Sequence, residues 1–205
     1  SDEFKDQFYK GRRPTGIYVP RFRNIDAKSK MPNFIRGYGY QGGGSREGWG
    51  RYIAEAEYGK GLKDALSQTG DWTFGMMAFG ECLPYHENKI SLNKDLKDIY
   101  GLPTLIMDAE WKTNELEMRK DMMASAAEML EAGGLKDINT YDAGCNPGLG
   151  IHEMGTARMG LDPKTSVLNK WNQIHSVPNV FVTDGSFMTS ASCVNPSLTY
   201  MAFTA

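Results

Sequence analysis

The segment that most constrains the fold is residues 114–132, because it is the clearest helix in the chain and follows a series of strand-like segments. Its apolar residues recur at helical spacing and form one face: Leu116, Met122, Met123, Ala126, Ala127, Met129 and Leu130. Asn114 is a candidate N-cap with Glu117 three residues later, and Gly133–Gly134 follows as a helix stop. We therefore expect one long helix that packs this face on a sheet.

The residues before this helix are typical of strands. β-Branched and aromatic residues are dense at 15–23, 33–41, 71–85, 88–95 and 102–111. Residues 51–66 are compatible with a short helix, and a further strand is expected at 179–184, within a run that we interpret as buried. Helices do not alternate with these strands, so the predicted fold class is α+β, with a mostly antiparallel sheet and helices packed on it.

Residues 37–42, GYGYQG, match the G-x-G-x-x-G pattern of dinucleotide-binding folds. That pattern binds pyrophosphate where a helix begins at the turn. Further glycines follow at Gly43, Gly44, Gly48 and Gly50, and they oppose a helix. We interpret this stretch as a glycine-rich strand and loop, and we expect any dinucleotide-binding domain to lie outside this sequence.

Composition excludes several classes of function. The 205 residues carry a formal net charge of −2, which provides no basic footprint for nucleic acid. No apolar run approaches the roughly 20 residues that cross a bilayer, and the first residues do not form a signal peptide. Cys82, Cys145 and Cys193 are widely separated, which suggests neither a disulfide framework nor a metal site. We expect a soluble protein of the cytoplasm or periplasm.

Three features of the C-terminal part follow one another in a specific order. Residues 149–160, LGIHEMGTARMG, place His152 among glycines. Residues 176–186, SVPNVFVTDGS, read as a strand that ends in Asp-Gly-Ser. Asn195 and Pro196 then provide an N-cap and a first helical residue. We expect the sequence to be cut before this last helix ends.

This ordered set resembles the C-terminal region of the glucose–methanol–choline (GMC) flavoprotein oxidoreductases. Members carry a His-x-x-Gly-Thr-x-x-Met-Gly segment, a strand that ends in Asp-Gly-Ser and an Asn-Pro-x-x-Thr helix start, which match residues 152–160, 177–186 and 195–199. The branch that looks nearest contains sugar, polyol and sugar-acid dehydrogenases and pyranose oxidase. The resemblance implies a substrate-binding domain at 1–146 and, at 147–205, an active-site segment that returns to an FAD-binding domain largely absent from this sequence.

The resemblance also implies roles for individual residues. His152 would accept the proton of a substrate hydroxyl while hydride passes to the flavin, and Asn195 would orient the substrate oxygen. The positions implied to contact FAD are Asp184, Gly185, Asn195, Pro196 and Thr199. We expect a sugar or polyol substrate, a separate electron-transfer partner as an option, no metal, and no activity from this sequence alone.

Two alternatives remain open on the residues alone. One is a fragment of a nicotinamide-dependent dehydrogenase, and the other is a carbohydrate-binding module without catalysis, in which His152 is an ordinary loop residue. Several other residues receive structural roles: His175 before the strand, His86 in a surface turn, and Arg158 as a brace of its loop. Trp49, Trp72 and Tyr40 could stack on a sugar, although packing in the core is their commoner role.

Overall fold

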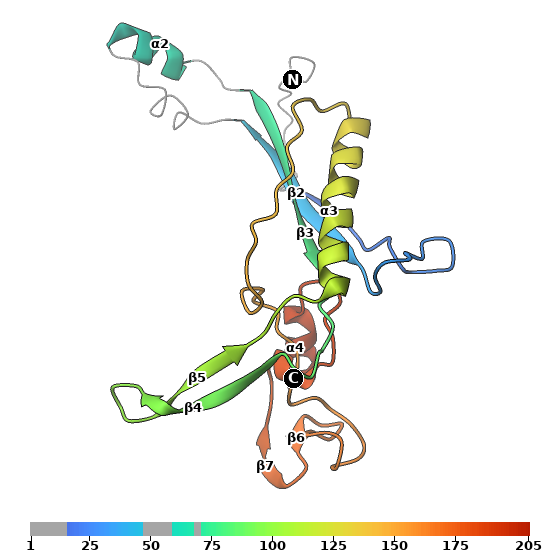
Figure 1. Ribbon diagram of the computed structural model, residues 1–205, viewed down its shortest axis with the longest axis vertical. Coiled ribbons are helices and arrows are strands. Elements are labelled where there is room, and N and C mark those ends of the chain that lie inside the picture. The colour runs from blue at the N-terminus through green and yellow to red at the C-terminus, as the bar shows by residue number, and fades with distance from the viewer. Residues whose placement is uncertain (1–15, 47–58, 68–70) are drawn as a thin grey trace.

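The computed structural model describes residues 16–46, 59–67 and 71–205 (Figure 1). The strands are β1 (Ile17–Val19), β2 (Tyr38–Arg46), β3 (Trp72–Gly80), β4 (Lys89–Lys97), β5 (Pro103–Asp108), β6 (Gln173–Ile174) and β7 (Val177–Phe181). The helices are α2 (Lys60–Ser67), α3 (Thr113–Ala132), the 3-10 turn η1 (Gly185–Phe187) and α4 (Ser197–Thr204). Every pair of strands is antiparallel, which confirms the predicted α+β class. No helix in these ranges has both the length and the apolar character needed to cross a membrane.

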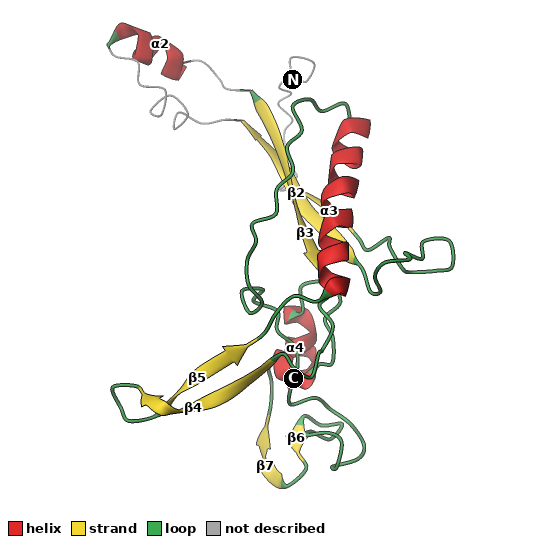
Figure 2. Ribbon diagram, in the orientation of Figure 1, coloured by secondary structure: helices red, strands yellow, loops and turns green. Residues whose placement is uncertain are grey.

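The central sheet has the order β1-β2-β3, and α3 lies along one of its faces (Figure 2). Tyr38 and Tyr40 alternate along β2 toward α3 and meet Met118 of that helix in the buried core. Phe22 packs edge-on against Tyr38, with 5.4 Å between the ring centroids. The core therefore lies between one face of the sheet and α3, as the apolar face of the helix predicts.

The two other sheets are hairpins that extend away from the central sheet (Figure 1). β4 pairs with β5, and β6 pairs with β7. The strand expected at 179–184 is observed at Val177–Phe181, but all five of its residues are exposed. The expectation of a buried strand was therefore wrong within the described residues, because no second layer covers this hairpin there.

The predicted N-cap of α3, Asn114, was wrong, because the N-cap is Lys112. The helix begins after Lys112, whose backbone N–H donates to Glu115 Oε2 at 3.3 Å. The other oxygen of Glu115 accepts from Leu83 N at 3.0 Å, so this carboxylate also fixes the chain that leaves β3. Asn114 does not cap the helix, because its Oδ1 accepts from Ile35 N at 2.8 Å.

The predicted end of α3 and part of its predicted apolar face are confirmed. Gly134 has a φ of +79°, and Leu135 N donates back to Leu130 O at 3.1 Å, as in a glycine-terminated helix. Met122, Ala126 and Met129 pack against the core. Leu116 was wrongly placed on this face, because its side chain is 44% exposed.

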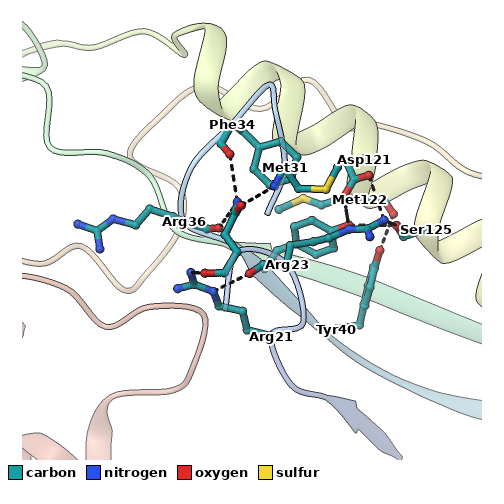
Figure 3. A network of polar contacts seen from close by, with 11 residues as sticks. Arg21, Arg23, Met31, Phe34, Arg36, Tyr40, Asp121, Met122 and Ser125 are labelled. Atoms are coloured by element: carbon teal, nitrogen blue, oxygen red, sulfur yellow. Dashed lines mark hydrogen bonds and ion pairs between the residues drawn. The ribbon is translucent and has the colours of Figure 1, made fainter. Parts of the chain in front are cut away.

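Polar groups also join α3 to the sheet and to the loop after β1 (Figure 3). Arg23 donates to Asp121 at 2.9 Å and to Ser125 at 2.9 Å, and the Tyr38 hydroxyl donates to the same Asp121 carboxylate. The Tyr40 hydroxyl donates to Met122 O at 2.7 Å. Each of these polar groups thus has a partner, which removes most of the cost of burying it.

A loop between β1 and β2 occupies residues that were predicted to belong to the two strands, 15–23 and 33–41. Asn24 donates to the carbonyls of Phe34 and Arg36, at 3.0 and 2.7 Å, and accepts from Met31 N at 2.7 Å. These bonds hold residues 33–37 in a loop, so β2 begins at Tyr38. As expected, residues 38–42 belong to a glycine-rich strand, and no helix begins there. Of the helix considered at 51–66, residues 51–58 lie outside the described ranges, and α2 occupies the rest.

Candidate active site

The face of the central sheet opposite α3 carries a row of three side chains. Tyr18 of β1 is paired with Gln41 of β2, which is paired with Met77 of β3. Because side chains alternate along a strand, this row points away from the row that includes Tyr40 and packs on α3. Met77 is 62% exposed and Tyr18 is 48% exposed. We call this side of the sheet the open face.

The C-terminal segment lies against one end of the open face. The Tyr18 hydroxyl donates to Cys193 O at 3.4 Å, and the Cys193 side chain is buried beside Gly39. The Ser190 hydroxyl donates to Glu81 Oε1 at 2.5 Å, just beyond the end of β3. These contacts bring residues that are more than a hundred positions away in the sequence onto the sheet.

A hollow of about 600 Å³ lies where the segment and the sheet meet. Its lining includes Tyr18, Gln41, Met77 and Phe79 from the sheet and Asn195 from the segment. Asn195 was predicted to cap the last helix, but α4 has Pro196 at its N-cap position, and Thr199 N donates to Pro196 O at 2.9 Å. The Asn195 side chain is exposed and lies beside the hollow, and no hydrogen bond joins it to another described residue.

His152 lies on an exposed loop that is attached to η1. Gly155 N donates to Gly185 O at 3.3 Å, and Met159 N donates to Phe187 O at 3.1 Å. The His152 ring is exposed, and within the described ranges it forms no hydrogen bond. It is not part of the lining of the hollow. Thus Asn195 borders the hollow, whereas His152 does not.

The positions predicted to contact FAD surround the start of α4 and the turn η1. Asp184 is exposed, and the hydroxyl and the N–H of Ser186 hold the pKa of its carboxyl below the usual value. An added Cβ on Gly185 would lie 2.7 Å from Tyr200 Oη and 3.0 Å from Met154 Cε. A larger residue at 185 would therefore have to displace the ends of these two side chains. Pro196 is buried and Thr199 is half-buried.

The structural roles that the sequence suggested for His175, Arg158 and Tyr40 are confirmed by their contacts. His175 Nε2 lies 3.1 Å from Ser166 Oγ and 3.2 Å from Gly160 O, and it thereby joins two loops. Arg158 donates to Thr165 O at 2.6 Å within its loop. Tyr40 belongs to the core, and His86 is exposed in a turn. Trp49 lies outside the described residues.

Sequence reasoning missed two features near the site. One is the set of sheet residues that line the hollow. The alternation of aromatic Tyr38 and Tyr40 with polar residues such as Gln41 could have indicated a second face of this strand. The other is a group that we call the clasp, formed by Trp111, Arg119 and Asp142. Trp111 Nε1 donates to Cys145 O at 2.6 Å, Arg119 stacks on the indole at 5.4 Å, and Arg119 pairs with Asp142. The clasp fixes the chain a few residues before His152.

Comparison with known proteins gives a consistent family. A model of the GMC oxidoreductase family matches residues 84–204. A 2-methyl-1,2-propanediol dehydrogenase from Mycolicibacterium austroafricanum is 34% identical, over 93% of this chain and 35% of that protein. The gluconate 2-dehydrogenase flavoprotein of Pantoea cypripedii is 32% identical, over 68% of this chain and 24% of that protein. A pyranose 2-oxidase from Tricholoma matsutake is 25% identical, over 61% of this chain and 24% of that protein.

These matches confirm the resemblance and the branch that the C-terminal motifs indicated. The chain spans about a third or less of the length of these relatives. The matched region begins well before the motifs, at residue 84, and so includes both β4–β5 and α3. Since the family model covers more than half of its residues, this chain belongs to the GMC oxidoreductases, which are flavoproteins that act on CH–OH donors.

Proposed function

We propose that the protein containing this chain is an FAD-dependent oxidoreductase that oxidises a CH–OH group of a sugar or polyol. The relatives named for a diol, a sugar acid and a pyranose support this class of substrate. The structural observation that carries the proposal is the position of Asn195 at the edge of a hollow in the open face. We assign residues 1–146 to substrate binding and residues 147–205 to the active-site segment.

We propose that the flavin binds at the start of α4. Ser197 at the first helical position is exposed, and a helix start offers free N–H groups and the positive end of the helix dipole. FAD, when bound, supplies the acceptor for hydride. We propose that Asn195, Pro196 and Thr199 lie along it, and that exposed Asp184 and the backbone of Gly185 contact its ribityl–pyrophosphate portion.

The chain's own residues would handle the proton and the substrate oxygen. We propose that His152 is the general base, because imidazole is the side chain that most often accepts a proton near neutral pH. The Asn195 amide would donate to the substrate oxygen as it becomes negative, without competing for the proton. The exposed loop that carries His152 leaves the ring accessible to a substrate.

Anaerobic reduction of the flavin tests this proposal. The full-length protein should purify with a flavin absorbance band, and a sugar or polyol should bleach that band without added nicotinamide. Reoxidation by oxygen, by a quinone or by a cytochrome would then identify the electron acceptor. A protein that binds sugars without flavin, or that reduces NAD⁺ in its place, would contradict the proposal and support one of the two alternatives.

A further inference from the structure

The hollow contains no charged side chain among its described lining residues, which are Tyr18, Gln41, Met77, Phe79, Asn195, two glycines and an isoleucine. We infer that this hollow selects neutral hydroxylated substrates over hydroxy acids, and that Gln41 provides the polar contact that reads a substrate hydroxyl. This inference rests on the proposed function, because it concerns the substrate of the same site.

Two arginines of the loop between β1 and β2 are engaged elsewhere. Arg21 donates from Nε to Arg23 O at 3.0 Å and from Nη2 to Asn24 O at 2.7 Å. Arg36 lies 3.7 Å from the Glu81 carboxylate. Neither belongs to the lining of the hollow. A substrate carboxylate in the hollow would therefore meet neither of these two cations.

Such an entry carries a penalty that grows with the hydration that the carboxylate loses. A carboxylate that leaves water needs a cationic partner or several hydrogen-bond donors to recover its hydration energy. The hollow offers two side-chain amides, one phenol and otherwise apolar groups. A neutral polyol loses far less on entry, because its hydroxyls bond equally well to amides and to water. We expect kcat/KM to be about 100-fold lower for an acid than for its neutral equivalent.

Gln41 is suited to recognise a hydroxyl. It occupies the middle of the open-face row, between Tyr18 and Met77, and no hydrogen bond joins its side-chain amide to another described residue. An amide both donates and accepts, and so does a hydroxyl, so the pair can form in either direction. The apolar side chains of Met77 and Phe79 would contact the C–H groups of the same substrate.

Two matched pairs of compounds test the inference: D-gluconamide against D-gluconate, and lactamide against lactate. Within each pair the carbon skeleton and the hydroxyls are the same, and a neutral amide replaces a charged carboxylate. The measurements are kcat/KM for anaerobic reduction of the flavin in the full-length holoenzyme, and the dissociation constant from calorimetric titration. We expect the amide of at least one pair to be preferred about 100-fold in both.

Added charge tests whether the hollow is the source of the preference. Gln41→Lys, or Met77→Lys if the first variant does not fold, should reduce the amide-to-acid ratio by about 10-fold or more. Ile90→Lys is the matched control, because Ile90 and Met77 are both 62% exposed and Ile90 lies outside the lining. Gln41→Met should weaken binding of the amide without improving the acid.

The outcomes separate this inference from the proposed function. If gluconate or lactate is used as well as its amide, the inference is wrong while the flavin chemistry stands. If the wild type prefers the amides but the folded lysine variant keeps that preference, the hollow does not determine it and the inference is again wrong. If no compound binds or reduces the flavin, and no other alcohol does so, both proposals fail.

Discussion

The two faces of the central sheet are built from the same strands but differ in how far their side chains are buried. On the face covered by α3, Tyr38 is fully buried and Met118 is 2% exposed. On the open face, Tyr18 and Met77 remain about half or more exposed and border a hollow. Because side chains alternate along a strand, neighbouring residues lie on opposite faces: Tyr40 is in the core and Gln41 is beside the hollow.

The treatment of polar groups differs in the same way. The hydroxyls of Tyr38 and Tyr40 both have partners in α3. Burial, followed by the effect of neighbouring groups, raises the pKa of both phenols above the ordinary value. The side-chain amides of Gln41 and Asn195, in contrast, have no partner among the described residues. Satisfied polar groups stabilise a fold, whereas unsatisfied and accessible ones are available to a ligand.

The largest effect should follow a change on the site side. We expect His152→Ala to lower the rate of flavin reduction about 10²–10⁴-fold, because a positioned base would be lost. The melting temperature should not change, since the ring is exposed and unbonded within the described residues. His86→Ala, which alters another exposed histidine, is the control. Reduction at the wild-type rate from pH 6 to 9, measured by stopped flow, would show that His152 is only a loop residue.

A smaller loss of rate is expected at Asn195. Asn195→Ala should slow flavin reduction about 10²–10³-fold, the effect of removing one donor to a developing oxyanion. Because Pro196 and not Asn195 stands at the N-cap position, the stability of α4 should be unchanged. Asn179→Ala, at an exposed asparagine of β7, controls for the loss of a surface amide. A lower melting temperature with an intact rate would make Asn195 a structural residue that does not contact the substrate.

Paired methionine variants test the covered face against the open face directly. Met118→Ala should lower the free energy of unfolding by about 2–5 kcal/mol, because it leaves a cavity under α3. Met77→Ala removes the same atoms from an exposed position and should cost less than about 0.5 kcal/mol. Chemical denaturation of both variants measures the difference. Equal losses would mean that the open face is covered in the intact protein.

The smallest effect concerns Tyr38 at alkaline pH. Its folded-state pKa is raised above 10.0 by burial and by Asp121, so its contribution is complete below pH 10 and is lost as the pH rises toward the folded value. Tyr38→Phe should cost about 1–2 kcal/mol at neutral pH, and its stability should fall less steeply than that of the wild type above pH 10. Denaturation curves between pH 8 and 11 provide the comparison. Parallel curves would show that Tyr38 does not titrate differently on unfolding.

Local patterns predicted much of this molecule. The periodicity of residues 114–132 and the glycines after it were sufficient for α3 and its end. The order of the C-terminal motifs was sufficient for the family. These features are readable because each depends on residues that are close in the sequence.

What was missed depends on contacts between distant residues. Glu115 takes the capping role from Glu117 because its carboxylate also binds Leu83, which a local pattern cannot indicate. β2 starts late because Asn24 holds the carbonyls of the preceding loop. The hollow is assembled from three strands and a distant segment, so its lining could not be read from any one of them.

The clasp has a consequence for how this protein can evolve. Met118 and Arg119 are neighbours on one turn of α3: the first packs into the core, and the second binds Asp142 in the segment that leads to His152. A substitution that shifts this turn alters the fit of the core and the position of that segment together. A single substitution at this turn would therefore affect both the stability of the core and the placement of the proposed active-site segment.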